Sequence, residues 1–380
     1  MSISDFKELK QGIKGYEKIY HLKINMEGAG LGAIILHVIS LLRFSDRENL
    51  YPVVDLDQKF DNAYFDADYG NNLWHQYFEP VLSISSQHLK EHSHHPQMQS
   101  LIYTLDTKEA HKICEEHDDS VYSFTFGRWR HLEDLDLDEW YQHQRVKARE
   151  TVKKYIRPNK ALRTKVDQFV RNHFTTGFTL GLHVRGTDMA YAPVVAPAEY
   201  FPHIDKCIEE NPDLKIFLAT DQAQYVTVFE EKYANRVLSI NALRSEDEIP
   251  PFLMEESTPF KKGEDVMMDI LLLSKCDFLI KSSSNVSEMA LYFGENLKCL
   301  DLAYKKTKAY GEDFGVFWDL LTTKPAWSLV GNTDLNEIAE DASSQSFRQQ
   351  IAFLKRKLTI NLRLLPMRML KTVRGILSDN

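Results

Sequence analysis

The chain has 380 residues and a formal net charge of −9, with 43% hydrophobic and 27% charged residues. A single hydrophobic core stops growing at about 250 to 300 residues, so two domains are expected, and the acidic balance argues against a protein built mainly to hold nucleic acid. Four scattered cysteines without a CxxC pair, a charged N-terminus and no apolar run near 18 residues predict a cytoplasmic protein of a reducing compartment.

The first strong pattern is a strand, a glycine-rich turn and a helix. The hydrophobic segment Tyr20–Met26 predicts the strand, and the apolar run 33–42 predicts the helix. A second strand is expected at Tyr51–Leu56, so the segment forms a βαβ unit. The glycines of the turn are Gly28, Gly30 and Gly32.

The middle of the chain has a weaker pattern. Residues 57–138 are aromatic and acidic and do not divide into clear elements. Helices are expected at 140–156, ending before Pro158, and at 161–174. We place a domain boundary there, with an N-terminal Rossmann-like domain at 1–160, a second Rossmann-like domain at 161–330 and C-terminal helices at 331–380.

The second half alternates more regularly between strands and helices, as in a doubly wound α/β domain. The expected strands are 178–184, 214–220, 236–240, 277–282 and 297–302, and the expected helices are 198–211, 222–233, 264–276 and 285–293. The fold class predicted for the whole chain is therefore α/β, with two Rossmann-like domains that face each other across a cleft.

Polar residues follow three of these strands. His183, Arg185, Thr187 and Asp188 stand at the end of the first, Thr220 and Asp221 at the second, and Ser282 to Asn285, including Ser283 and Ser284, before a helix. Each set alone is explained by an ordinary salt bridge or a helix cap. Ligands of open parallel sheets bind at the carboxyl ends of strands, so three such sets together favour a nucleotide crevice.

The motifs HVRGTD (183–188), FLATD (217–221) and 264–290 together resemble the nodulation-protein Z and α1,6-fucosyltransferase family over roughly residues 180–302. The resemblance is to a bacterial member. It implies the GT-B fold and transfer of fucose from GDP-fucose to a saccharide hydroxyl, with inversion and without a metal or other cofactor.

The resemblance also implies residue roles. Arg185 matches the arginine that holds the β-phosphate, Asp188, Asp221 and Asp269 match carboxylates that shape the donor site, and Ser284 matches a serine near the diphosphate. Inverting transfer needs a group that accepts the acceptor's proton, for which Asp188 and Glu27 are the candidates.

The sequence departs from the eukaryotic α1,6 pattern at three positions. Gly186 stands where a second arginine is usual, Met189 replaces a lysine and Glu288 replaces an arginine. Two of these differences are expected to remove positive charge that faces the phosphates.

Four other functions stay open. The glycine turn with Asp55 imitates the dinucleotide site of an NAD-dependent oxidoreductase, although Gly32 follows Gly30 too closely for the usual spacing. The acidic pairs at 55–57 and 66–68 suggest a metal-dependent transferase. A transferase for another nucleotide sugar, or a non-catalytic sugar-nucleotide-binding protein, fits the same motifs.

The C-terminal segment 351–377 contains seven Lys or Arg residues and no acid. It predicts either a helix packed on the body or a basic amphipathic helix that makes peripheral contact with the inner membrane. The acceptor is expected to be a saccharide or a glycolipid.

Overall fold

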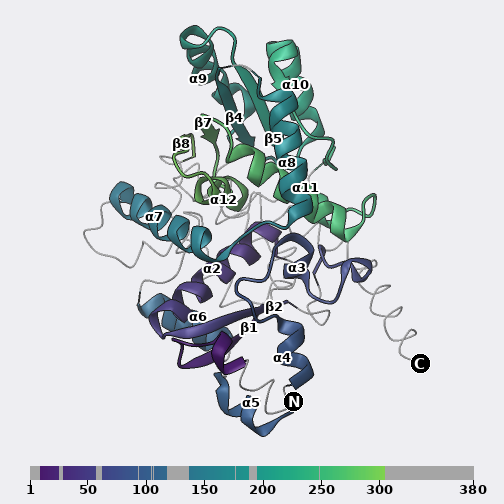
Figure 1. Cartoon of the computed structure of the whole chain (residues 1–380). Coiled ribbons are helices and arrows are strands. Elements are labelled where there is room, and N and C mark those ends of the chain that lie inside the picture. Colours follow the sequence, from purple (N-terminus) through teal and green to yellow (C-terminus); the bar gives the residue numbers. More distant parts are fainter. Residues whose placement is uncertain are drawn as a thin grey trace, which may run out of the picture.

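The computed structural model describes residues 9–24, 29–56, 62–92, 94–103, 105, 107–117, 137–175, 177–187, 195–247 and 249–303. It is an α/β structure with two parallel sheets, which confirms the predicted fold class (Figure 1). Glu27, Gly28, Asp188, Met189 and the basic tail lie outside the described residues. Within the described residues, no helix combines the length and the apolar character needed to cross a membrane.

The first sheet has the order β2-β1-β3 and is parallel. Its strands are β1 (Lys18–Lys23), β2 (Leu50–Asp55) and β3 (Ile102–Tyr103), and α2 (Leu31–Arg47) connects the first two. The ladder between β1 and β2 ends at the pair Lys23 and Asp55. The next backbone N–H, that of Leu56, donates to Asn72 instead. The strand expected at 20–26 is β1, which begins two residues earlier and ends three residues earlier than expected.

Short helices fill the segment that the sequence pattern did not divide. They are η1 (Ala67–Tyr69), α3 (Leu73–Tyr77), α4 (Ser86–His92), α5 (Pro96–Leu101) and α6 (Thr107–Glu116). Asn72 caps α3 by accepting from the backbone N–H of Trp74, and Trp74 and Tyr77 are buried. Helices of five to ten residues give too few turns for a clear apolar period, which is why the pattern missed them.

The second sheet has the order β6-β5-β4-β7-β8, and all of its pairs are parallel. Its strands are β4 (Thr179–Val184), β5 (Lys215–Thr220), β6 (Val237–Leu238), β7 (Phe278–Lys281) and β8 (Lys298–Asp301). The helices of this half are α7 (Leu137–Tyr155), α8 (Lys160–His173), α9 (Pro197–Glu210), α10 (Ala223–Tyr233), η4 (Ala234–Arg236), η5 (Pro251–Leu253), α11 (Pro259–Leu273) and α12 (Asn285–Phe293).

One hydrophobic core joins the two sheets. It includes Leu22 of β1, Phe217 of β5 and Leu279 of β7, with the buried faces of α2, α11 and α12 between them. Figure 1 shows these helices in the middle of the molecule, with one sheet above and one below. The amino-terminal turns of α2 and α12 meet so closely that a Cβ on Gly32 would lie 3.0 Å from the Cβ of Asn285. The division at residue 160 stays a prediction.

Candidate functional site

The candidate site lies where the order of the second sheet reverses. β5 and β6 extend from one side of β4, whereas β7 and β8 extend from the other. β4 and β7 are neighbours, with His183 paired to Lys281. The chain segments that leave these strands, Arg185 and 282–285, are therefore side by side. In doubly wound sheets such a switch point is where ligands bind.

The loop after β4 is held by Asp221. Its carboxylate accepts hydrogen bonds from the Gly186 N–H at 2.7 Å, the Thr187 N–H at 3.2 Å and the Thr187 hydroxyl at 2.7 Å. The Nε of Arg185 donates to the Thr187 carbonyl at 3.1 Å. The hydrogen bonds of Asp221 and Thr187 therefore hold the segment around Arg185 in position.

The neighbouring side chains leave room only for a glycine at position 186. A Cβ there would lie 2.3 Å from Cγ of Gln222 and 2.8 Å from Cε2 of Tyr225. The space that a second arginine would need is filled by the start of α10. Thr220, at the end of β5, is buried, and its hydroxyl oxygen accepts from the Gln222 N–H at 3.3 Å.

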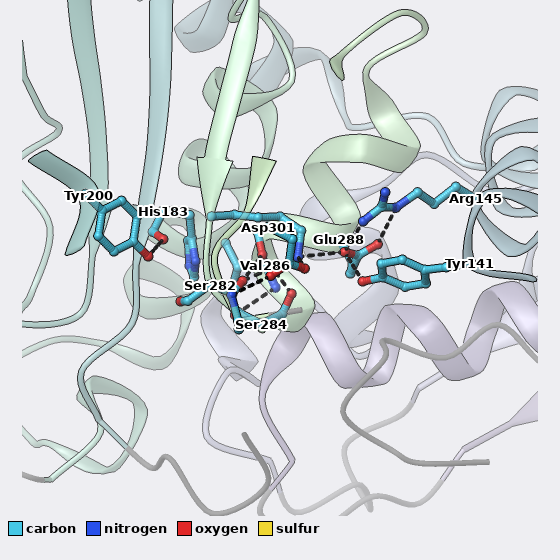
Figure 2. A network of polar contacts seen from close by, with 12 residues as sticks. Tyr141, Arg145, His183, Tyr200, Ser282, Ser284, Val286, Glu288 and Asp301 are labelled. Atoms are coloured by element: carbon cyan, nitrogen blue, oxygen red, sulfur yellow. Dashed lines mark hydrogen bonds and ion pairs between the residues drawn. The ribbon is translucent and has the colours of Figure 1, made fainter. Parts of the chain in front are cut away.

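The turn after β7 begins α12. The Ser284 side chain is the N-cap and accepts from the Val286 N–H at 3.2 Å, while Ser283 is buried beside it. The Ser287 hydroxyl donates to the carbonyls of Ser282 at 3.2 Å and Ser284 at 3.0 Å (Figure 2). The first turn of α12 is therefore rigid, and its remaining backbone N–H groups carry the positive end of the helix dipole.

Several buried polar atoms of the second half lack a hydrogen-bond partner. Within the described residues they include Nδ1 of His183, Oδ1 of Asn285, Oδ1 of Asp269 and Nε of Arg244. Native proteins pair nearly all such atoms, so a group of unpaired ones marks a place where a ligand completes the set. Both donors and acceptors are represented, which fits a ligand with several polar groups.

His183 is neutral in this environment. The residue is 6% exposed, and burial lowers the pKa of its imidazole to about 3, helped by the positive charges of Arg185 and Lys281. A neutral ring donates or accepts through its nitrogens without adding charge. His183 is therefore suited to hydrogen bonding with a ligand and not to acting as a cation or a general base near neutral pH.

Asp269 lies on α11 beside the β5 and β6 side of the crevice. Burial raises the pKa of its carboxyl to about 8, and the nearby Asp265 and Asp221 add to the rise against the effect of Arg244. Arg244 follows β6, and its two terminal nitrogens donate to the carbonyls of Ala242 and Ile240. Arg244 was missed by the sequence analysis, since nothing in its neighbourhood resembles a motif.

Glu288, at a position where the resemblance expects an arginine, takes part in an internal network. Its carboxylate is buried and is paired with Arg145 of α7 at 3.0 and 3.1 Å and with Lys281 at 2.9 Å, and it accepts from the Tyr141 hydroxyl (Figure 2). Lys281 also pairs with Asp301 at 2.6 Å. These opposite charges compensate each other, so the network stabilises the structure next to the turn that begins at Ser282.

Two carboxylates that the other functions would use, Asp55 and Asp66, are engaged in internal contacts. Asp55, which would bind a ribose in a dinucleotide fold, is paired through one oxygen with His21 at 2.8 Å and through the other with Lys90 at 2.9 Å. Asp66 caps η1 through the backbone N–H of Asp68. Within the described ranges no group of three or more His, Cys, Asp or Glu side chains is placed to hold a metal ion.

No protein-family model and no curated protein matches the sequence. Among solved structures, the chain is similar to the fucosyltransferase NodZ from Bradyrhizobium, with 16% identity, a TM-score of 0.43, and coverage of 72% of this chain and 92% of that one. It is also similar to FUT1 of Arabidopsis thaliana in complex with GDP, with 13% identity, TM-score 0.42, and coverage of 79% and 74%. A third is POFUT1 with GDP-fucose, at 8% identity, TM-score 0.45, and coverage of 75% and 97%. At identities and TM-scores this low, the function has to be argued from the site residues.

Proposed function

We propose that this chain is a glycosyltransferase of the GT-B type that moves fucose from GDP-fucose to a hydroxyl of a saccharide or glycolipid acceptor. The transfer inverts the anomeric configuration and needs no metal. The reaction takes place in the cytoplasm, at the crevice between the two Rossmann-like halves. Two alternatives are another nucleotide sugar as donor and binding of the donor without turnover.

The observation that carries the proposal is the arrangement at the switch point. Arg185 and the first turn of α12 follow adjacent strands, the buried Nδ1 of His183 at the end of β4 has no hydrogen-bond partner, and the start of α2 approaches from the other half. A guanidinium fork and helix N–H groups are the donors that a diphosphate prefers. We place the diphosphate of the donor there.

We place the guanine base of the nucleotide beside Asp269 and Arg244. A carboxylate accepts two parallel hydrogen bonds, and guanine presents two neighbouring donors, its ring N–H and its amino group. Arg244 offers a donor for the guanine carbonyl oxygen. These residues support a guanine nucleotide over an adenine nucleotide, whose base lacks this pattern of donors and acceptor.

Arg185 supplies the main stabilisation of the leaving group. As the bond from the sugar to the β-phosphate oxygen breaks, negative charge develops on GDP, and a fixed guanidinium stabilises it most strongly in the transition state. Asp188 and Glu27 are proposed to accept the acceptor's proton. Peripheral contact of the basic tail with the inner membrane would bring a lipid-linked acceptor to the crevice.

The test is calorimetric titration of the purified chain with GDP, GDP-fucose, GDP-mannose and NAD, each with and without a chelator. We expect guanine nucleotides to bind in both conditions and NAD not to bind. Replacing Arg185 with Ala should weaken GDP binding by about tenfold or more, since a charge-assisted hydrogen bond is lost, while thermal unfolding stays close to wild type.

Other results of these experiments would contradict individual parts of the proposal. Binding of NAD alone would identify an oxidoreductase, and loss of GDP binding in chelator would require a metal. Tight binding of GDP-fucose with no hydrolysis and no transfer to any glycan on an acceptor array would identify a binding protein. An Arg185→Ala variant with unchanged GDP affinity would remove Arg185 from the site.

A further inference from the structure

Tyr69 is an exposed aromatic residue at the junction of the two halves. It lies in η1, in the first half, and its ring stacks on that of Phe260 of α11, in the second half. The ring centroids are 3.6 Å apart and the planes are within 1° of parallel. Tyr69 is nevertheless 54% exposed. Since Phe260 covers one face of the ring, the opposite face is open to solvent.

The turn that carries Tyr69 is held by hydrogen bonds. The Asp66 carboxylate accepts from the Asp68 N–H at 3.1 Å. The buried Gln76 side chain donates to the Asp66 carbonyl at 2.7 Å and accepts from the Asp66 N–H at 3.3 Å. Gly70, with a φ of 111°, ends the turn in a conformation that glycine adopts most readily. The ring is therefore fixed before a ligand arrives, which lowers the entropy cost of binding.

Phe260 is connected to the crevice through two tyrosines. The Tyr77 ring also stacks on Phe260, with centroids 5.6 Å apart, and its hydroxyl donates to the Phe260 carbonyl at 3.0 Å. The same hydroxyl lies 3.1 Å from the carbonyl of Tyr64, whose own hydroxyl oxygen is 3.9 Å from the position of a Cβ on Gly30. Gly30 precedes α2, so the exposed ring lies along the junction that leads to the proposed donor site.

The surroundings of Tyr69 favour a sugar over an apolar protein segment. Its neighbours Asp68, Gly70 and Asn71 are exposed. Among the described residues, the other exposed large hydrophobic side chain is Val146 of α7, which Figure 1 shows well to the left of α3. Protein interfaces need a contiguous apolar patch, which is not present around this ring. A pyranose has an apolar C–H face that fits the negative face of an aromatic ring, and hydroxyls that bond to carboxylates and amides.

We propose that Tyr69, supported by Phe260, is a stacking platform for a sugar unit of the saccharide acceptor, remote from the hydroxyl that receives fucose. The identification of this saccharide as the acceptor rests on the proposed function. A contact far from the reacting bond is equally strong before and during transfer. The platform therefore lowers the KM for oligosaccharide acceptors and leaves kcat unchanged.

The experiment measures saccharide binding by the full chain without any donor. Fluorescently labelled wild type, Tyr69→Phe, Tyr69→Ala and Val146→Ala are applied to an array of immobilised monosaccharides and oligosaccharides of graded length. Tyr69→Phe keeps the ring and should bind the same oligosaccharides as the wild type within about twofold, whereas Tyr69→Ala should bind about tenfold more weakly. Val146→Ala, the matched control, removes the other exposed hydrophobic side chain and should bind as the wild type does.

Two further measurements separate the platform from the donor site. Titration with GDP should give the same affinity for the wild type and Tyr69→Ala, and thermal unfolding should show that both are folded. With GDP-fucose and the oligosaccharide that binds best, Tyr69→Ala should raise the acceptor KM by about tenfold and keep kcat within about twofold of wild type.

The platform is overturned if the wild type binds no saccharide on the array, if Tyr69→Ala binds as the wild type does, or if Tyr69→Phe loses as much as Tyr69→Ala. Self-association of the wild type in sedimentation velocity that Tyr69→Ala abolishes would also overturn it, because the ring would then serve a contact between copies. Saccharide binding that depends on Tyr69 in a chain that binds no guanine nucleotide would retain the platform and overturn the proposed function.

Discussion

At the scale of single residues, the crevice is marked by polar atoms that the fold leaves unpaired. His183 and Asp269 are the clearest cases, since burial lowers the pKa of the first and raises that of the second. In both, burial favours the neutral form. A neutral imidazole needs no counter-charge, whereas a protonated carboxyl near Arg244 is set to ionise when a ligand brings hydrogen-bond donors to it.

Under the proposed function, Asp269 is expected to link GDP binding to pH. Its pKa of about 8 in the free protein means that it is mostly protonated at neutral pH, and the donors of guanine favour the carboxylate. We expect GDP affinity to rise with pH up to about 8 and then to level off, with release of about one proton on binding near pH 7. Calorimetry in two buffers of different ionisation enthalpy measures this release.

Asp269→Asn should bind GDP without that proton release. Asp265→Asn, one turn earlier on α11, should reduce the proton release only in part, because the Asp265 charge contributes to the raised pKa of Asp269. Equal proton release by the wild type and Asp269→Asn would show that the linkage has another source. The same raised pKa predicts that the wild type loses stability relative to Asp269→Asn as the pH rises from about 4 to about 8, where the unfolded chain releases a proton that the folded protein keeps, and that the difference stays constant above pH 8.

At the scale of elements, the site depends on how closely two helices approach. The first turns of α2 and α12 meet through Gly32 and Asn285, which brings two positive helix ends to one place. Like ends repel, and the arrangement becomes favourable when an anion lies between or beside them. The glycine is needed for this approach, because any side chain would push α2 away from α12.

Replacing Gly32 with Ala tests the approach. The new Cβ would lie 3.0 Å from Cβ of Asn285 and 3.3 Å from its backbone carbon, so the helices must separate by a few tenths of an ångström. We expect GDP affinity to fall by about tenfold while stability changes by no more than about 1 kcal/mol, because Ala favours the helix. Titration and denaturant unfolding measure the two effects separately.

The control is Gly12→Ala, at a helical glycine where a Cβ would meet Ile84 at an ordinary 3.6 Å. This variant should bind GDP as the wild type does. Wild-type GDP affinity in Gly32→Ala would mean that the two helix ends do not form the phosphate site together.

At the scale of the whole molecule, a buried charge network ties α7 to the second sheet. Arg145 of α7 and Lys281 of β7 both pair with Glu288, and all three side chains are buried. Breaking a buried pair leaves an uncompensated charge and costs about 3 to 5 kcal/mol. The network therefore fixes α7 and α12 relative to β7, directly beneath the turn that begins at Ser282.

We expect Glu288→Gln to lower the free energy of unfolding by about 3 to 5 kcal/mol. Its pKa of about 2 means that the wild type loses this stabilisation as the pH falls from about 4.5 towards 2, whereas the variant does not. Denaturant unfolding at several pH values tests both statements. The matched control is Glu295→Gln, which removes the exposed ion pair between Lys153 of α7 and the turn after α12 and should cost less than about 1 kcal/mol. Equal losses in the two variants would contradict the structural role of the buried network.

The sequence by itself determined the local elements and their chemistry. Short apolar runs located β4 and β5, which are buried along nearly their whole length, and apolar residues at helical spacing located α11 and α12. Polar residues directly after a strand, such as Arg185 and Ser284, could be assigned to the carboxyl edge of a sheet before the sheet was known. The short helices between β2 and α7 were beyond this reasoning, since they contain too few turns.

Only the tertiary structure decided which of these edges meet. The strand order places β7 beside β4. Packing of α12 against α7 pairs Glu288 with Arg145, so that its carboxylate does not serve the turn at 282–285. The same packing brings Arg244, which carries no motif, close to Asp269. Such contacts join residues far apart in the chain, and their energies depend on burial and on the fit of whole elements, so no local pattern records them.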